Sequence, residues 1–360
     1  MSLLAAMIVL AAPALCAAAP SQARVVGLAD QQAASFTHPQ LTALPVRHAR
    51  LSVAWDALRY GWQREEIDEW MRTTAAAKMT VVVTFGRSRT RPFSLPPAAE
   101  YREQARRFMR RYRSVREYSP WNEPNLAIAP RNYDPRRIAE YYRVLRSSCP
   151  RCRVLGADLV DTSSLGHWMR AYLRQFAPRS RPKLWGLHNY VDVNSFSSWG
   201  TRTMLRLAPG AIWFTETGAI IRRDPTRTNT GDRRDLIRSG SAGAVAATKR
   251  VFTLAATSRR ITRVYIYHWR AGRSSWDSGL LSAAGTPRAS FDVFARQARL
   301  AAGRRQPVAG GPVLPGPPPV LPATPAAPTP PRPSALLCLQ SPRACGTAPY
   351  SSGAEVRPFG

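Results

Sequence analysis

The chain has 360 residues, of which 52 are Lys or Arg and 22 are Asp or Glu, so its formal net charge is +30. Apolar residues make up 44% of the chain, which is enough for a sizeable core and excludes a wholly disordered basic protein. Lys occurs only at Lys78, Lys183 and Lys249 and no nucleic-acid-binding motif accompanies the arginines, so we interpret the charge as coding bias and expect no nucleic-acid partner.

The first 23 residues are predicted to be a secretion signal. An apolar run extends from Leu3 to Leu10, and Ser21-Gln22-Ala23 offers a small-x-small cleavage site. No Lys or Arg precedes the run, so a cleaved leader and a retained anchor both stay open. We expect a secreted protein, extracellular or associated with the cell wall, without a stable membrane partner.

Residues 24–303 alternate between short apolar runs and amphipathic stretches of helical length, which is typical of parallel strands joined by crossover helices. Strands are predicted at 25–29, 49–55, 80–85, 115–119, 153–159, 184–188, 212–215 and 263–267. Helices are predicted at 65–77, 99–112, 136–147, 165–176 and 236–256, among others. Eight strand–helix units in this length predict an α/β fold, a single (β/α)8 TIM barrel.

Residues 304–360 are predicted to be a Pro-rich disordered tail. Fifteen of the 32 prolines lie between Gln306 and Gly360, and such a segment is extended and does not pack a core. Within it, Cys338 and Cys345 are spaced to close a small loop.

A second local cysteine pair, Cys149-Pro-Arg-Cys152, follows a predicted helix and precedes a predicted strand. A redox CxxC motif normally lies where a strand leads into a helix, so we predict a structural disulfide here, which fits a secreted protein.

The chemistry of such a barrel lies at the carboxyl ends of its strands, so the polar residues after each apolar run are the candidates. Glu123 follows the fourth predicted strand in Ser-Pro-Trp-Asn-Glu-Pro-Asn, and Glu216 closes the seventh in Trp-Phe-Thr-Glu-Thr-Gly. The two acids are 93 positions apart, which matches the three intervening units.

This arrangement resembles clan A of the retaining glycoside hydrolases, the barrel enzymes that include cellulase-like and xylosidase-like families. The resemblance covers nearly all of residues 24–302. It rests on Asn-Glu-Pro after the fourth strand and a Glu at the seventh, with support from the stretch Arg50–Trp55, from His188-Asn-Tyr190 and from Trp269.

The resemblance implies that Glu123 is the general acid and base and that Glu216 is the nucleophile. It places Asn122 on the sugar hydroxyl beside the reacting carbon and Trp269 under the sugar ring as a stacking floor. The chemistry also asks for different pKa values, so we expect an uncharged, shielded Glu123 facing an ionised Glu216.

Arg50 and Tyr190 are the predicted donors to Glu216, because an unpaired arginine inside a buried strand would be costly. His188 either bonds a sugar hydroxyl or supports Glu123. Trp55, Trp121 and Trp276 are weaker stacking candidates, and Asp158, Asp161 and Asp192 are candidates for lining further subsites. The spacing of His, Cys and acids suggests no metal site, so we expect neither a metal nor another cofactor.

The leading hypothesis is a secreted, monomeric O-glycosidase that acts on a poly- or oligosaccharide. The alternative from another class is a barrel that binds cell-wall polysaccharide without cutting it. The positive net charge leaves one functional hypothesis open, namely that the substrate is an acidic polysaccharide. Sugar, linkage, anomer, endo or exo action, and hydrolysis or transglycosylation stay open.

Overall fold

The computed structural model describes residues 24–92, 94–126, 133–223, 241–272 and 276–303. The predicted leader, the predicted tail and the Cys338/Cys345 pair therefore lie outside the described residues. Among the described residues, no helix is long and apolar enough to cross a membrane.

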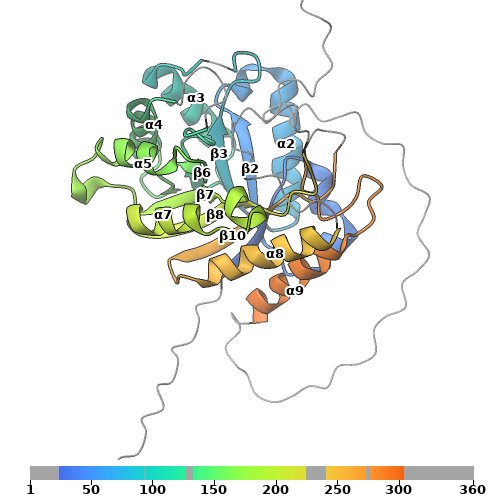
Figure 1. Cartoon of the computed structure of the whole chain (residues 1–360). Helices are drawn as coiled ribbons and strands as arrows, with labels where there is room; N and C mark the ends of the chain where they lie inside the picture. The colour runs from blue at the N-terminus through green and yellow to red at the C-terminus, as the bar shows by residue number, and fades with distance from the viewer. Residues whose placement is uncertain (1–23, 93, 127–132, 224–240, 273–275, 304–360) are drawn as a thin grey trace, which may run out of the picture.

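A parallel sheet forms the centre of the molecule, and helices lie around its outside (Figure 1). Its strands are β1 (Val25–Ala29), β2 (His48–Ala54), β3 (Thr80–Gly86), β4 (Glu117–Ser119), β5 (Arg153–Val154), β6 (Asp158–Val160), β7 (Leu184–His188), β8 (Ala211–Thr217) and β10 (Ile261–Tyr267). Their order is β5-β4-β3-β2-β1-β10-β8-β7-β6. The strands are buried along almost their whole length, as expected for a sheet covered on both faces.

The sheet closes at the fifth predicted strand, which is divided into β5 and β6. β5 pairs with β4, and β6 pairs with β7. Between them, Leu155 N donates to Tyr118 O, and Gly156 N donates to Leu184 O, both at 2.8 Å. Because this segment bonds to both neighbours, the predicted eight-strand TIM barrel is confirmed, with one irregular strand.

Helices connect the strands, and the longer ones bury one face against the sheet and expose the other. The helices are α1 (Pro39–Thr42), α2 (Gly61–Ala76), α3 (Ala98–Arg111), α4 (Pro135–Ser148), α5 (Leu165–Leu173), α6 (Tyr190–Asn194), α7 (Trp199–Leu207), α8 (Ser241–Ala256) and α9 (Ala289–Gly303). In α3 the buried Tyr101, Ala105 and Phe108 recur at intervals of four and three residues. The Tyr101 ring stacks on that of Tyr141 of α4, with centroids 4.0 Å apart.

A two-stranded ribbon lies beside the barrel. It consists of β9 (Arg222–Arg223) and β11 (Trp276–Asp277), which pair antiparallel. β9 follows β8 and β11 follows β10, so the ribbon joins two loops that leave the carboxyl ends of strands.

The amino ends of the strands hold a buried ion pair. Arg263 of β10 donates to both carboxylate oxygens of Glu117 of β4, at 2.6 and 2.8 Å. Its guanidinium also lies 3.9 Å from the ring centroid of Trp213. The buried Arg263 is therefore paired at the end of the barrel opposite the predicted site, so its charge is not left uncompensated.

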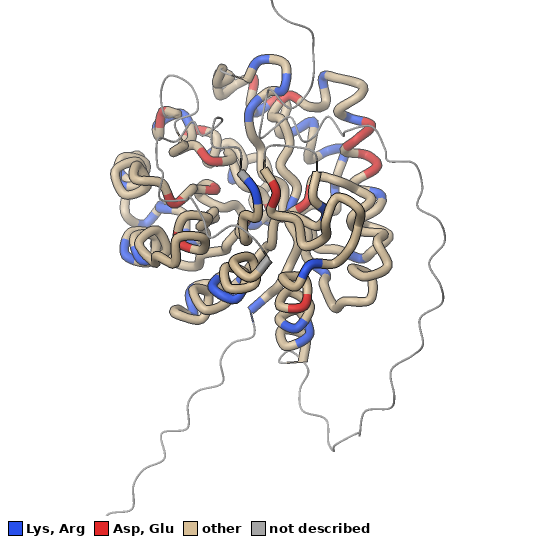
Figure 2. The backbone as a smooth tube through the Cα atoms, turned by 45° about the vertical axis from the view of Figure 1, so that its right-hand side comes forward, with Lys and Arg blue, Asp and Glu red and all other residues tan. Residues whose placement is uncertain are grey.

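Apart from Arg50 and Arg263, the described Lys and Arg side chains are exposed or half-buried. Figure 2 shows Lys and Arg positions on several sides of the tube and not in one stripe.

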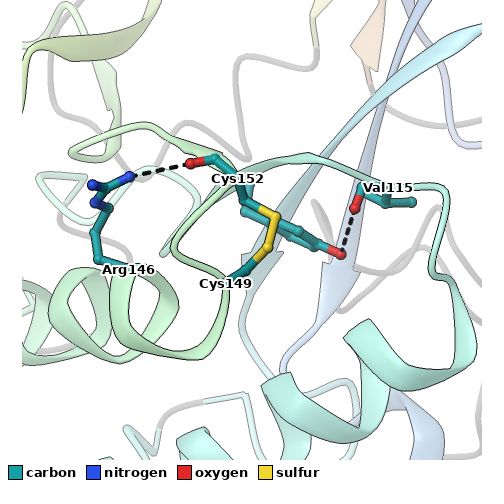
Figure 3. Close-up of a disulfide and its surroundings, with 5 residues drawn as sticks. Val115, Arg146, Cys149 and Cys152 are labelled. Carbon is teal, nitrogen blue, oxygen red and sulfur yellow. Dashed lines mark hydrogen bonds between the residues drawn. A yellow bond between two sulfur atoms is a disulfide. The ribbon is translucent and has the colours of Figure 1, made fainter.

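The predicted Cys149–Cys152 disulfide is confirmed (Figure 3). Cys149 is the C-cap residue of α4 and Cys152 immediately precedes β5, with Cα atoms 5.3 Å apart. Arg146 Nη1 donates to the Cys152 carbonyl at 3.1 Å, which further ties the end of the helix to the start of the strand.

Candidate active site

The two candidate acids meet at the carboxyl ends of the strands. Glu123 follows β4, and Glu216 is the sixth residue of β8. A carboxylate oxygen of Glu123 lies within 4.8 Å of one of Glu216, and His188 Nδ1 lies 2.8 Å from Glu123 Oε1 and 3.9 Å from Glu216 Oε2. In retaining glycosidases the two carboxyl groups are about 5 to 5.5 Å apart, whereas inverting enzymes need about 6.5 to 9.5 Å.

Arg50 connects the residues of the site from its position on β2. Its side chain is completely buried. Nη1 donates to Glu216 Oε2 at 2.8 Å, and Nη2 donates to Asn122 Oδ1 at 2.6 Å. The predicted contact between Arg50 and Glu216 is therefore present, and the same guanidinium also orients Asn122.

Asp158 holds the other side of that guanidinium. Its Oδ2 accepts from Arg50 Nε at 3.2 Å and Nη2 at 2.8 Å, and from Thr84 Oγ1 at 2.7 Å. Burial opposes its ionisation, but the Arg50 and His188 charges and these hydrogen bonds outweigh burial and hold the pKa of Asp158 well below its ordinary value. The expectation that Asp158 lines a subsite is wrong, because it is a buried anchor for Arg50.

The backbone at Glu123 is in the left-handed region, with φ of 50°. Its N–H donates to Asp158 O at 2.8 Å, and the N–H of Asn122 donates to Phe85 O at 2.8 Å. These bonds to both neighbouring strands hold a conformation that non-glycine residues adopt at a cost. The turn aims the Glu123 side chain at His188 and Glu216.

His188 supports Glu123, which is one of its two predicted roles. Its Nδ1 lies 2.8 Å from Glu123 Oε1. Burial lowers the pKa of His188, but Glu216, Asp158 and Glu123 outweigh burial and raise it to about 9. At neutral pH the imidazole is therefore charged and donates to Glu123.

The prediction of an uncharged Glu123 is wrong for the unliganded site. Burial raises the pKa of Glu123, but the hydrogen bond from His188 and the charges of His188, Arg87 and Arg50 bring it below its ordinary value. The surrounding charges lower the pKa of Glu123 and raise that of His188, so they favour the proton on the imidazole. The two groups titrate as a pair that shares one proton.

Tyr190 is the second predicted donor to Glu216, and the structure shows the contact. Its hydroxyl donates to Glu216 Oε1 at 3.1 Å. Burial and the Glu216 charge raise the pKa of Tyr190 well above its usual range, so the hydroxyl keeps its proton for this bond.

Trp269 does not lie with the carboxylates, which corrects its prediction as a sugar platform. Its side chain is 1% exposed and contacts the rings of Phe291 and Phe294 of α9 edge-on, at centroid distances of 5.7 and 6.5 Å. A ring enclosed between the strand and an outer helix is inaccessible to a sugar.

Two further aromatic residues, Tyr267 and Trp276, lie beside Tyr190. Trp276, a weaker candidate, packs edge-on against Tyr190 at 5.0 Å. Tyr267 was missed. It packs in one cluster with Tyr190, and its high pKa arises from burial and then from the Glu216 charge. Side chains alternate between the two faces of a strand, and Arg263, Tyr265 and Tyr267 are alternate residues of one strand. This alternation would have predicted that the Tyr267 side chain lies inside the barrel.

The other two acids expected to line subsites are structural, which corrects that expectation. Asp161 accepts from the N–H groups of Val191 and Asp192 at 3.0 and 2.7 Å. Asp192 in turn accepts from two N–H groups at the start of α7, at 3.1 and 2.6 Å. Both carboxylates are buried, and both accept hydrogen bonds from backbone N–H groups.

Glu123, His188 and Glu216 together satisfy the distance requirement for a three-ligand metal site. However, Arg50 already places a cation on Glu216, and the imidazole of His188 is protonated at neutral pH. A metal ion bound here would have to displace the proton of His188 and compete with Arg50 for Glu216.

No protein-family model matches the chain, and no curated protein sequence does either. Among solved structures, it is similar to a family 39 glycoside hydrolase from Bacteroides cellulosilyticus WH2, with a TM-score of 0.50 and 13% identity over 78% of this chain and 64% of that one. The match thus spans slightly less than two thirds of the length of that protein.

Two further structures match over most of their own length. A GH5_18 protein from Bifidobacterium longum subsp. infantis gives a TM-score of 0.54 and 15% identity, over 80% of this chain and 81% of that one. A structure of fungal β-1,4-galactanases gives a TM-score of 0.53 and 16% identity, over 75% of this chain and 98% of that one. The chain therefore has the barrel fold of clan A glycoside hydrolases, as its sequence motifs predicted.

Proposed function

We propose that this protein is a retaining O-glycoside hydrolase that uses Glu123 as acid and base and Glu216 as nucleophile. The observation that carries the proposal is the pair of carboxylates within 4.8 Å of each other at the ends of β4 and β8. That separation leaves no room for a water molecule to attack between the second carboxylate and the sugar, as inversion requires.

In the first step, a Glu216 oxygen attacks the anomeric carbon while the proton of the Glu123–His188 pair passes to the leaving glycosidic oxygen. The carbon–oxygen bond to the aglycone breaks, and a glycosyl–Glu216 ester forms. In the second step Glu123 takes a proton from water, whose oxygen attacks the same carbon and releases Glu216.

His188 supplies the proton that the first step needs. The hydrogen bond of 2.8 Å between its Nδ1 and Glu123 Oε1 lets the proton return to the carboxylate. As negative charge develops on the leaving oxygen, the proton is drawn from the imidazole through Glu123. The same pair recovers a proton when Glu123 activates water.

Arg50 and Tyr190 both donate hydrogen bonds to the Glu216 carboxylate and fix its orientation. Arg50 also fixes the oxygen end of the Asn122 amide. The amide nitrogen is then directed to donate to the sugar hydroxyl next to the reacting carbon, a bond that strengthens in the transition state.

We further propose that the protein acts outside the cell, secreted or associated with the cell wall. The apolar leader and the disulfide both support this location, because disulfides persist in oxidising compartments. Edman sequencing of the exported protein beginning near Arg24 would support cleavage, whereas protein retained entirely inside the cell would contradict the location.

The catalytic proposal is tested with Glu123→Ala and Glu216→Ala on a panel of plant, fungal and bacterial polysaccharides. Both variants should fold yet lose hydrolysis by about a hundredfold or more. Added azide should restore turnover in each, because it enters the space of the missing carboxyl group. It should give the glycosyl azide of inverted configuration with Glu216→Ala and of retained configuration with Glu123→Ala.

Full activity in both alanine variants would refute the proposal. Tight binding of a polysaccharide without turnover of any bound ligand would instead favour the polysaccharide-binding barrel. Activity that persists in a metal chelator, with the same dependence on both acids, separates the carboxylate mechanism from a metal site at the same residues.

A further inference from the structure

The loop after β3 carries three arginines in five residues, namely Arg87, Arg89 and Arg91. It begins at the carboxyl end of β3, the edge of the sheet where the two catalytic carboxylates lie. Two of the three cations have partners in the fold. Arg89 Nη1 donates to Glu66 Oε2 at 2.8 Å, and Arg91 lies within 3.7 Å of Asp56 and 3.6 Å of Glu100.

Arg87 differs from the other two. Within the residues that the structure describes, it forms neither a hydrogen bond nor an ion pair, and its Nη1 is shielded from solvent without a partner. A shielded donor of a charged group that has no acceptor is costly. Such a group is poised for an acceptor that arrives from outside the chain.

The position of Arg87 is beside the acid and base catalyst. Gly86 packs next to Asn122, since a Cβ on it would lie 3.4 Å from the Asn122 Cβ. The charge of Arg87 lowers the pKa of both Glu123 and Tyr133, so Arg87 lies near both side chains. A ligand on Arg87 would therefore touch the sugar-binding space around Glu123.

We propose that Arg87 binds the carboxylate of a uronic acid residue in the substrate, so that the substrate class is an acidic glycan. This inference rests on the proposed glycosidase function and names its substrate. A guanidinium binds a carboxylate through two parallel hydrogen bonds that match in geometry and charge. A neutral hydroxyl would accept one bond and leave the charge uncompensated.

An acidic substrate would also favour protonation of Glu123, the acid that the first step needs. In the unliganded site, the Arg87 charge is one of the influences that lower the pKa of Glu123. A bound carboxylate would cancel this influence, so Glu123 would hold the proton more readily once the correct substrate is present. The substrate would thereby help to prepare the acid that cleaves it.

The test compares glucuronoxylan, polygalacturonan and alginate with the same polymers after chemical reduction of their carboxyl groups to primary alcohols. Binding to the full chain is measured by isothermal titration calorimetry at physiological salt, and turnover by reducing-end release. The variants are Arg87→Gln, the conservative Arg87→Lys, and Arg91→Gln, which removes an equal charge from the same loop at a 49% exposed side chain.

The wild-type protein should bind at least one native polymer about tenfold or more tightly than its reduced form. Arg87→Gln should abolish this preference, Arg87→Lys should keep a smaller part of it, and Arg91→Gln should keep it fully. Equal binding of native and reduced polymers would overturn the inference. So would a preference that survives Arg87→Gln or is lost equally in Arg91→Gln, because it would reflect the general surface charge.

The two proposals fail separately. Hydrolysis of neutral and reduced polymers without any carboxylate preference would leave the glycosidase intact and refute the role of Arg87. A carboxylate preference in binding that depends on Arg87, without any hydrolysis, would support the role of Arg87 and count against the catalytic proposal.

Discussion

Asp158→Asn removes the carboxylate that anchors Arg50 and changes almost no volume. Asp158 Oδ2 accepts three hydrogen bonds, two from the completely buried guanidinium and one from Thr84. An asparagine in the same position carries no charge, so Arg50 would keep Glu216 and Asn122 but lose its second anion. The variant isolates the contribution of one buried charge to the scaffold of the site.

The expected loss in free energy of unfolding is about 3 to 5 kcal/mol, the usual cost of breaking a buried ion pair. The pKa of Asp158 in the folded protein is well below its ordinary value, so its contribution is complete above the unfolded pKa of about 3.9. As the pH falls from about 5 to 3, the unfolded carboxylate takes up a proton first. The difference between wild type and variant should therefore shrink.

The assay is urea unfolding of both proteins between pH 3 and pH 7. Thr84→Val is the matched control, since it removes one hydrogen bond to the same oxygen and should cost only about 1 to 2 kcal/mol. A loss below about 1 kcal/mol in Asp158→Asn, or a difference that does not change with pH, would refute the assignment of Asp158 as the ionised anchor.

Three further predictions follow from the site and the fold. Because the pKa of His188 is raised to about 9, kcat/KM should fall as the pH rises through about 9. His188→Gln should move this fall to lower pH, and a pH profile that does not move would contradict the proton shared by His188 and Glu123. Replacing Cys149 and Cys152 together by Ser should cost about 2 kcal/mol of unfolding free energy, because the closed loop is short; a loss above about 4 kcal/mol would imply a larger role. Trp269→Phe should lower the melting temperature without changing KM, whereas a rise in KM at unchanged stability would restore it as a sugar platform.

The strand pattern was largely predictable because each strand is a short apolar run bounded by polar residues. The bounds of β1 and β7 were predicted without error. The fifth strand was predicted as one piece, and its division could not be foreseen. It depends on the way Leu155 and Gly156 bond to different neighbours, which only the closed sheet determines.

The contacts of Glu216 with Arg50 and Tyr190 were predictable from one physical argument, that a buried arginine must be paired. The protonation states of Glu123 and His188 were not predictable from the sequence. Whether the proton resides on Glu123 or His188 depends on the summed charges of Asp158, Arg50 and Glu216 at distances that the sequence does not contain.

The face on which a residue lies near a strand end was also beyond the sequence. Trp269 follows β10 by two positions, where the chain has left the regular alternation of the strand, and its ring packs outward on α9. Tyr267, still within the strand, keeps the alternation and packs with the residues at the site.

The most direct test of the central claim is the configuration of the product at the moment of release. Proton NMR of the anomeric signal during hydrolysis of the best substrate from the panel distinguishes the two outcomes before mutarotation mixes the anomers. Carboxylates within 4.8 Å of each other predict that the first-formed sugar has the same anomeric configuration as the substrate. A first-formed sugar of opposite configuration would contradict Glu216 as the nucleophile.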